Sequence, residues 1–235
     1  MRRKRTGAKH IRALGLATAF ALVLSVVAGG PAMAKDAEEA QGIVDNSRVT
    51  FGNFIRDKNY EWIRDNLNRA KGVLIYPQVL KAGFFLGGSG GTGVLLARDA
   101  KTGEWSQPAF YTLGSVSFGL QFGGQASETI VMVMSQKGMD SLFTSKFKLG
   151  GDASVAAGPV GAGAQSDVTA DFISFSMAQG LFAGVSLDGA YIAVRDSLNE
   201  SYYGKKVSPV AIIVEKAASN KGSAALREEL RKAAK

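Results

Sequence analysis

Hydrophobic and polar positions follow two different spacings along this chain. Between residues 37 and 56 the apolar side chains recur every three to four positions, which predicts an amphipathic helix with one buried stripe. The same spacing predicts a second, shorter helix over residues 60–70, with Asn59 placed to cap it and Gly72 to end it. The chain is therefore expected to begin its folded part with two helices.

From Val73 onward the apolar residues alternate with small or polar ones, a spacing that is typical of strands. Strands are expected over residues 73–76, 84–86, 94–98, 105–111, 117–123, 129–134 and 173–177. Pro77 is expected to stop the first of them. Residues 185–194 have Asp188-Gly189 at their centre, which predicts a hairpin.

Helices interrupt and close this β region. Ser135 is placed to cap a short helix that runs to Phe143. Ser208-Pro209 predicts a helix over residues 210–217, for which a strand is the competing interpretation, and residues 223–233 form an amphipathic helix. The fold class expected is α+β: a single domain in which an antiparallel, glycine-rich sheet lies between N-terminal and C-terminal helices. The pattern leaves open whether that sheet is barrel-like.

The first 34 residues read as a secretory signal peptide rather than as part of the fold. A basic start without acids is followed by a short apolar segment over residues 13–28 and then by Ala32-Met33-Ala34. The apolar segment is shorter than the roughly 20 residues that a membrane-spanning helix needs. We therefore expect cleavage after Ala34, an exported protein of the periplasm, cell envelope or medium, and one domain over residues 35–235. Retention of residues 1–34 as an anchor is the alternative.

Removal of this segment changes what the composition allows. Six of the 28 basic residues lie in it, which leaves 22 basic against 20 acidic residues and weakens the case for nucleic-acid binding. The only histidine, His10, lies in it as well, and the chain has no cysteine. Nucleophilic sites that pair Ser or Cys with His are therefore excluded, and zinc sites are disfavoured. We expect no metal and no cofactor, and a protein that is not an enzyme.

The stretch Gly88-Ser89-Gly90-Gly91-Thr92-Gly93 matches the G-x-G-x-x-G fingerprint of dinucleotide-binding turns. Such a turn must open a helix, because the helix N-terminus provides the N–H groups that bind the pyrophosphate. Only five residues, 94–98, separate Gly93 from the next turn, and they read as a strand. We therefore expect no nucleotide, and we interpret the glycines as positions where another backbone or a ligand approaches a sheet closely.

Two further sets of residues are weak candidates for chemistry. Ser145-x-x-Lys148, Ser197-x-Asn199 and Lys101-Thr102-Gly103 match elements of serine-lysine acyl-transfer enzymes, but the last element comes first in this chain. Most of the carboxylates in the β region sit in turns, where an Asp bonds its own backbone. Neither set supports an enzyme.

Charge is distributed unevenly along the chain. Basic residues gather in residues 46–81 and again after residue 200, and the segment between them is acidic overall. In the first basic segment the cations alternate with aromatic residues, a composition that suits an anionic membrane surface. The candidate lipid-binding residues are Arg48, Arg56, Lys58, Arg64, Arg69, Lys71, Lys81 and Trp62. The alternative is that the aromatic residues face the core and the charges are only solvated.

Many spaced elements of residues 40–217 resemble the SYLF domain. They include KGVLIYPQVLKAGFFLGGSGGTGVLLARD, GEWSQPAFYTLGSVSFGLQFGGQ, MDSLF, LGGDASVAAGPVG, FSMAQGLFAGVSLDG and LNESYYGKKVSP. The resemblance implies a mixed helix and sheet fold and a phospholipid-binding module without enzymatic activity. In eukaryotic members it also implies actin regulation and a basic amphipathic N-terminal helix. In this chain residues 35–45 are acidic, so any membrane contact is expected later in the first helix.

The function expected from the sequence is a non-enzymatic, exported, lipid-binding domain that docks on phospholipid membrane, with anionic lipid as its ligand. The alternative is a cell-envelope structural or protein-interaction module without a lipid ligand. Neither interpretation includes nucleic acid or nucleotide, and a protein partner is compatible with both.

Overall fold

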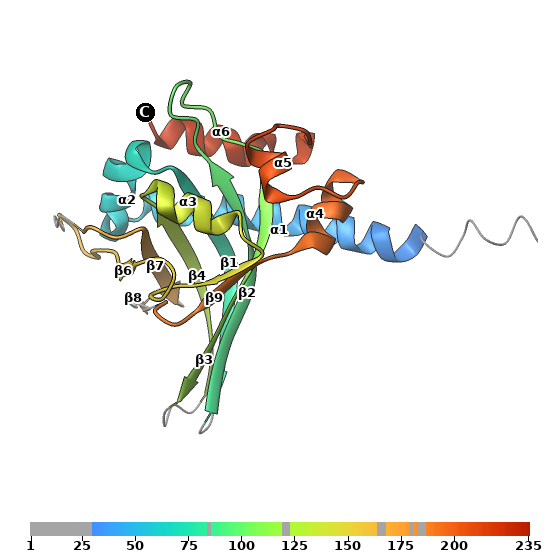
Figure 1. Ribbon diagram of the computed structural model, residues 1–235. Coiled ribbons are helices and arrows are strands. Elements are labelled where there is room, and N and C mark those ends of the chain that lie inside the picture. Colours follow the sequence, from blue (N-terminus) through green and yellow to red (C-terminus); the bar gives the residue numbers. More distant parts are fainter. Residues whose placement is uncertain (1–29, 84–85, 119–122, 164–167, 179–180, 183–186) are drawn as a thin grey trace, which may run out of the picture.

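The computed structural model describes residues 30–83, 86–118, 123–163, 168–178, 181–182 and 187–235 (Figure 1). The helices are α1 (Gly30–Arg56), α2 (Glu61–Asn66), α3 (Gln136–Leu142), α4 (Asp196–Tyr203), α5 (Pro209–Ile213) and α6 (Ala224–Ala233). Short 3-10 helices are η1 (Lys58–Tyr60), η2 (Leu67–Arg69) and η3 (Lys221–Ser223). The strands are β1 (Gly72–Gly83), β2 (Leu86–Ala97), β3 (Ala109–Phe118), β4 (Gly123–Val133), β5 (Lys146–Lys148), β6 (Val155–Ala157), β7 (Phe172–Ala178), β8 (Leu181–Phe182) and β9 (Tyr191–Val194).

The strands form one sheet that curls into a half-barrel (Figure 1). The strand order is β5-β9-β3-β2-β1-β4-β7-β6, and β8 pairs with β7. Every pairing is antiparallel except that of β6 with β7. The expected α+β domain with an antiparallel sheet between N-terminal and C-terminal helices is confirmed.

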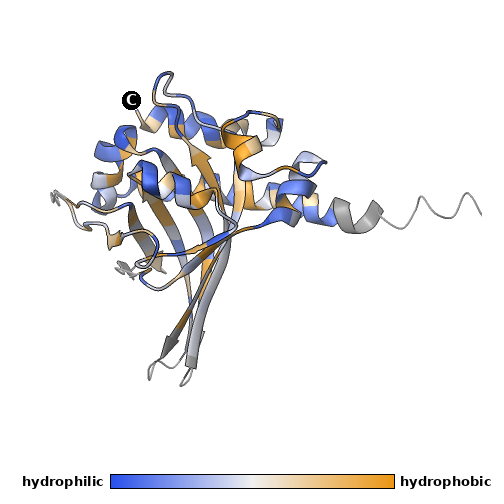
Figure 2. Ribbon diagram, viewed as in Figure 1, coloured by the Kyte–Doolittle hydropathy of each residue, from blue (hydrophilic) through white to orange (hydrophobic). Residues whose placement is uncertain are grey.

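Both faces of the sheet are packed within the body of the domain. One face carries Ile75, Val94 and Phe110, which pack against buried residues of α1, α2, α4 and α6. The other carries Leu74 and Tyr111, which pack against α3, α5 and the loops next to β5 and β9. Figure 2 shows the hydrophobic strands of the body beneath helices whose outer sides are hydrophilic. Because both faces are buried, the central strands read as continuous apolar runs rather than as clean alternations.

The predicted caps and stripes of the helices are mostly confirmed. The hydroxyl of Ser135 accepts a hydrogen bond from the Gly138 amide, and that of Ser208 accepts one from the Ala211 amide. The second helix is split into α2 and η2, and Asn59 does not cap it: the Asp57 side chain caps η1 instead, one residue after α1 ends. In this cap the carboxylate oxygen of Asp57 accepts a hydrogen bond from the backbone amide of Asn59 at 2.8 Å.

Pro77 does not end the first strand, as the sequence suggested. Strand β1 continues to Gly83, and its register shifts between Tyr76 and Val79 against β4 and between Ile75 and Leu80 against β2. A bulge of this kind leaves an unpaired position where the missing N–H of proline costs no ladder hydrogen bond. The strands predicted over residues 94–98 and 105–111 are also displaced: β2 begins at Leu86 and includes the glycine stretch, and β3 begins at Ala109.

Some predictions lie partly outside the described residues. The expected strands over residues 84–86 and 117–123 fall mostly there, as does the first arm of the expected 185–194 hairpin. Its second arm is β9, which pairs with β3 and β5.

Candidate functional site

Strands β1 to β4 run beyond the body of the domain and form a four-stranded extension (Figure 1). Among the described residues, β9 pairs with β3 as far as Gly114, and β7 pairs with β4 as far as Ser127. Residues past those points therefore belong to a part of the sheet that the helices of the body do not sandwich.

Strand register places one row of residues across the start of this extension, all on the same face. Paired residues of neighbouring strands point to the same side of a sheet. The row is Lys148, Tyr191, Gly114, Gly90, Leu80 and Ala126. Val116 lies two positions from Gly114 on the same strand, paired with Gly88, and therefore adds to the same face.

This face is apolar and open to solvent. Leu80 is 55% exposed, Val116 70% and Tyr191 43%. They are three of the five large hydrophobic residues that are exposed in the described part of the chain. We call the surface made by Leu80, Gly88, Gly90, Gly114, Val116, Ala126 and Tyr191, with Lys146 and Lys148 at its edge, the uncovered face.

The opposite face of the extension is polar. The hydroxyls of Ser89 and Ser115 share a hydrogen bond of 2.7 Å there, and Lys81 and Gln125 are exposed beside them. The extension therefore has the two-sided pattern of a half-buried antiparallel sheet, in which the apolar side normally packs against a core. Here the apolar side meets solvent, which is the usual mark of a surface that binds something else.

The glycines of the Gly88–Gly93 stretch belong to two groups, which differ in what surrounds them. A Cβ on Gly91 would lie 2.3 Å from the Gln78 carbonyl oxygen, and one on Gly93 would lie 2.2 Å from the Ile75 carbonyl oxygen. These two residues are small because β1 approaches closely at its bulge. A Cβ on Gly90 would come no closer than 3.6 Å to any atom, and one on Gly114 would meet nothing within 4 Å among the described residues.

Gly90 and Gly114 therefore have no packing role that requires glycine. Both lie in the row between Leu80 and Tyr191, so the floor between these two side chains is bare backbone. Glycine in a strand interior weakens the strand, and its presence commonly marks a place where another molecule approaches the backbone. The interpretation of the motif as part of a sheet holds, and no helix follows Gly93.

Two lysines border the uncovered face on strand β5. The ammonium of Lys146 lies 4.3 Å from the centre of the Tyr191 ring, and that of Lys148 lies 6.0 Å from it. Both side chains are exposed on either side of the buried Phe147. An ammonium near an exposed tyrosine, next to aliphatic side chains, joins positive charge to an apolar surface.

At its other end the uncovered face runs into a groove beneath α1. The groove has a volume of about 470 Å³, and Gly90, Leu80 and Pro77 form part of its floor. Ile43 and Val49 of α1 form part of its wall, and Val49 is 51% exposed. Glu128 closes one side, where it accepts hydrogen bonds from Thr50 and Asn53. The groove thus joins the extension to the helix, and its lining is mixed, because Glu39, Asn46 and Gln78 also contribute to it.

The arginines predicted to bind lipid are engaged within the chain. Arg48 forms an ion pair of 2.9 Å with Glu229 of α6. The Arg64 guanidinium donates to the Ile55 carbonyl at 2.6 Å and lies 3.3 Å from Glu61. Arg56 and Arg69 are exposed, and each donates to the side chain of an asparagine three residues earlier. These contacts tie Arg48 and Arg64 to the fold itself.

The other four predicted residues are spread over different parts of the molecule. Trp62 is buried and packs against Phe175, with ring centres 5.6 Å apart, so it offers no surface to a membrane in this conformation. Lys58 is exposed on η1, Lys71 is half-buried before β1, and Lys81 stands on the polar side of the extension. The structure does not bring the eight residues into one surface, and their role as lipid contacts stays a prediction.

Sequence reasoning missed the residues of the uncovered face. Val116 lies between two serines, and Leu80 forms only a short apolar pair with Val79, so no longer apolar run marks either residue. The small residues beside them come from neighbouring strands: Leu80 pairs with Gly90 and Ala126, and Val116 pairs with Gly88. Such a surface can be recognised only when the register between strands is known.

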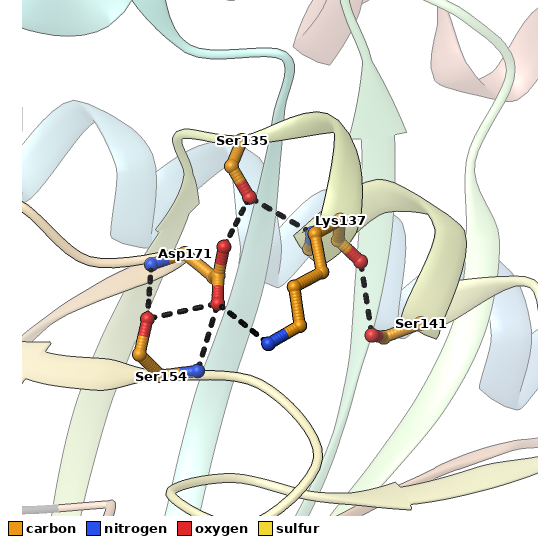
Figure 3. A network of polar contacts seen from close by, with 6 residues as sticks. Ser135, Lys137, Ser141, Ser154 and Asp171 are labelled. Atoms are coloured by element: carbon orange, nitrogen blue, oxygen red, sulfur yellow. Dashed lines mark hydrogen bonds and ion pairs between the residues drawn. The ribbon is translucent and has the colours of Figure 1, made fainter.

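Asp171 is the centre of a polar network, shown in Figure 3, that joins α3, β6 and β7. It accepts hydrogen bonds from the Ser135 hydroxyl at 2.5 Å and from the Ser154 amide and hydroxyl at 2.9 and 2.8 Å. The Lys137 ammonium lies 3.7 Å away. The hydrogen bond from Ser135 is the main reason why the pKa of Asp171 is lowered. Because Ser135 is a helix cap, this arrangement is structural rather than catalytic.

The described residues offer no metal site and no membrane-spanning helix. No group of three or more His, Asp or Glu side chains that could hold a metal ion occurs among the described residues. Over the same residues, no helix is both long and apolar enough to cross a membrane. Lys101-Thr102-Gly103 lies in a turn, where the Asp99 carboxylate accepts from the amides of Lys101 and Thr102.

Comparison with known proteins gives evidence of the family that does not depend on the geometry of the site. A family model described as Las17-binding protein actin regulator, Ysc84, matches residues 114–233, which includes α6 at its end. LAS seventeen-binding protein 3 of Saccharomyces cerevisiae is 35% identical over 158 residues, which cover 63% of this chain and 34% of that protein. SH3 domain-containing YSC84-like protein 1 of Xenopus laevis is 30% identical over 142 residues, covering 58% of this chain and 42% of that protein.

Protein YSC84 of Saccharomyces cerevisiae is similar to the same degree, with 35% identity over 156 residues, 63% of this chain and 32% of that protein. The chain thus spans about a third of the length of the yeast relatives that it matches. Their names describe proteins that bind Las17 or carry SH3 domains, and they name no enzymatic activity.

Proposed function

This chain belongs to the Ysc84 family of Las17-binding protein actin regulators, and on that premise we propose that it is a non-enzymatic domain that binds anionic phospholipid membrane. The surface that we assign to this role is the uncovered face. The observation that carries the proposal is the exposure of Leu80, Val116 and Tyr191 on one side of the sheet, with Lys146 and Lys148 beside them.

The composition of the uncovered face suits a lipid surface. Half-exposed aliphatic and aromatic side chains gain roughly 1 kcal/mol each when they leave water, since full burial of such a side chain is worth about 1.5–3 kcal/mol. Each lysine close to an anionic leaflet adds about 1 kcal/mol. Three apolar residues and two lysines therefore supply on the order of 5 kcal/mol, which corresponds to weak, reversible docking in the range between millimolar and micromolar affinity.

The bare floor between Leu80 and Tyr191 lets the ligand follow the sheet closely. These side chains stand three strand spacings apart, about 14 Å, with Gly90 and Gly114 between them. A fluid lipid surface adapts to such a shallow trough, and the polar side of the extension stays in water. A protein partner could use the same trough, in keeping with the names of the relatives, and the vesicle experiment below separates the two.

We also propose that the protein works outside the cytoplasm, on the strength of the basic, apolar and A-x-A segments of residues 1–34. Cleavage after Ala34 would leave α1 from Lys35 to Arg56, which retains the residues that pack on the sheet. Mass spectrometry of the protein recovered from the expressing cells and their medium tests this. A mature N-terminus at Lys35 is expected, and an intact residue 1–34 segment in the cytoplasm would contradict it.

Vesicle flotation tests the lipid proposal. Protein beginning at Lys35 is mixed with neutral phosphatidylcholine vesicles or with vesicles that contain phosphatidylglycerol, at low and at high salt. Binding is expected with the anionic vesicles and is expected to weaken as salt screens the lysines. Failure to float with either vesicle would refute the lipid ligand and leave the protein-interaction alternative.

Substitutions on the two sides of the extension test whether the uncovered face is the surface that contacts the vesicle. Leu80→Ser with Val116→Ser should reduce flotation at least tenfold, whereas Gln125→Ser on the polar side should leave it unchanged. Lys146→Gln with Lys148→Gln should remove most of the dependence on anionic lipid. Charge reversal of the exposed Arg56, Lys58 and Arg69 tests the sequence-based prediction of the lipid contacts. A loss of binding confined to this variant would move the site to α1, η1 and η2.

A further inference from the structure

A second cavity lies on the other side of the molecule's body, away from the extension. It has a volume of about 660 Å³ and is formed by residues 97–107, residues 212–219 and Arg227 of α6. This volume is within the range of small-molecule sites. None of its lining residues belongs to the uncovered face or to the predicted lipid-binding residues.

Two hydrogen-bond donors of residues that line this cavity have no partner among the described residues. They are the indole N–H of Trp105 and the Nε–H of Arg98, both closed off from bulk water. Trp105 is 2% exposed, and the two residues face each other as a β-bridge at the base of the 99–104 turn. A buried donor without an acceptor costs about 1–3 kcal/mol, so a ligand that shifts the neighbouring side chains and brings an acceptor to these donors relieves a real penalty.

The cavity also carries unpaired positive charge. The Arg227 Nε donates to the Trp105 carbonyl at 2.8 Å, which turns this guanidinium toward the cavity wall. Within the described part of the chain, neither Arg98 nor Arg227 forms an ion pair with a carboxylate. Their remaining N–H groups are therefore available to a ligand.

The net charge of the lining favours a ligand with a single negative charge. Lys216 completes the three cations, and Asp99 and Glu104 supply two carboxylates. Asp99 is already occupied by the amides of its own turn and by Lys216, whose ammonium lies 3.7 Å away. One positive charge is left over, which suits a monoanion better than a phosphate dianion.

The remaining lining is aliphatic. Ile212 and Ile213 are buried beside the cavity, and Val214 is 59% exposed at its edge. The cavity thus combines a polar end, made of guanidinium and indole donors, with an apolar end.

We propose that this cavity binds a small aliphatic carboxylate. The carboxylate accepts hydrogen bonds from Arg98 and Arg227, whose planar guanidinium groups match its geometry, and brings an acceptor to the Trp105 indole. The hydrocarbon part lies against Ile212, Ile213 and Val214. This site is independent of the proposed membrane contact.

Tryptophan fluorescence tests the site directly, because the chain has only two tryptophans. In a Trp62→Phe variant the emission reports on Trp105 alone. Titration with octanoate should give a saturable change in emission and a rise in melting temperature, since a ligand that binds only the folded state stabilises it. Octanol and octylammonium, which share the hydrocarbon chain, should give neither effect.

Substitutions decide between this site and non-specific uptake. Arg98→Gln and Arg227→Gln should each weaken octanoate binding at least tenfold, measured by calorimetry. Leu80→Ser with Val116→Ser should leave it unchanged. The proposal is overturned if octanoate produces no saturable change, if octanol binds equally well, or if both arginine variants bind octanoate as the parent chain does.

Trp105→Phe provides a check that does not depend on the arginine variants folding well. The ligand-free variant should melt below the parent chain only by the cost of replacing a buried indole with a smaller ring, because the indole N–H has no partner among the described residues. The same change should weaken octanoate binding several-fold. Unchanged octanoate affinity in this variant would remove Trp105 from the site and contradict the argument from the unpaired donors.

Discussion

Neighbouring glycines of one motif should respond in opposite ways to the same substitution. Gly90 and Gly91 are consecutive residues of β2, and neither has the positive φ that would make alanine strained. Their surroundings differ: a Cβ on Gly91 meets the Gln78 carbonyl oxygen at 2.3 Å and the Val79 Cα at 3.2 Å, whereas one on Gly90 comes no closer than 3.6 Å to any atom.

The size of the effect follows from these distances. A Cβ at 2.3 Å from a backbone oxygen is about 1 Å inside normal contact, and the obstacle is the bulge of β1 rather than a flexible side chain. Overpacking of this kind costs about 1–3 kcal/mol. Gly90→Ala has no such cost and lowers the entropy of the unfolded chain, which is worth about 0.4–1 kcal/mol in favour of folding.

Thermal unfolding followed by circular dichroism measures the difference. For a domain of this size, 1 kcal/mol shifts the melting temperature by about 2–4 °C. Gly91→Ala should therefore melt several degrees below the parent chain, and Gly90→Ala at or slightly above it. Gly114→Ala, where nothing lies within 4 Å of the added atom, is a second control. Equal destabilisation by all three would refute the division of the motif into packing glycines and open glycines.

Two further predictions concern the polar groups of the interior. The hydrogen bond from the Ser135 hydroxyl lowers the pKa of Asp171 in the folded protein. The ionised Asp171 therefore stabilises the fold above about pH 3.9, the pKa of the unfolded chain, and this stabilisation is lost as the pH falls through the folded pKa. Asp171→Asn should make the free energy of unfolding less dependent on pH in the acid range, and an unchanged dependence would contradict the network. Tyr76→Phe should be neutral or stabilising, because the buried hydroxyl of Tyr76 has no partner among the described residues. Tyr111→Phe should cost about 1 kcal/mol, since the hydroxyl of Tyr111 donates to the Leu142 carbonyl. Urea titration of the two variants measures both, and equal losses would count against this assignment of partners.

The sequence predicted the elements whose signals are local. The stripe of α1, the caps at Ser135 and Ser208, and the amphipathic α6 each depend on residues a few positions apart, and the structure has them where they were expected. Pro77 misled the strand prediction because the bulge that accommodates it is defined by two neighbouring strands, β2 and β4, and not by residues next to it in sequence.

The site was harder to predict because its parts meet only through strand register. Leu80 and Tyr191 are more than a hundred residues apart, and they share one row because four strands align at Gly90 and Gly114. The basic residues near α1 form a cluster in the sequence. The sequence does not show, however, that Arg48 forms an ion pair with Glu229, which lies 181 residues away along the chain. Clusters of like charge are therefore weaker evidence for a surface than rows of small and apolar residues once the register is known.

The most direct test of the central claim uses the absence of cysteine from this chain, which allows a single environment-sensitive label to be placed at will. One variant carries Val116→Cys on the uncovered face, and the other carries Gln125→Cys on the polar side of the same extension. On addition of vesicles that contain phosphatidylglycerol, a nitrobenzoxadiazole label at position 116 should shift its emission to the blue and gain intensity, and the label at position 125 should not. Blue shifts of equal size at both positions, or a shift at position 125 alone, would contradict the assignment of the uncovered face as the membrane-binding surface.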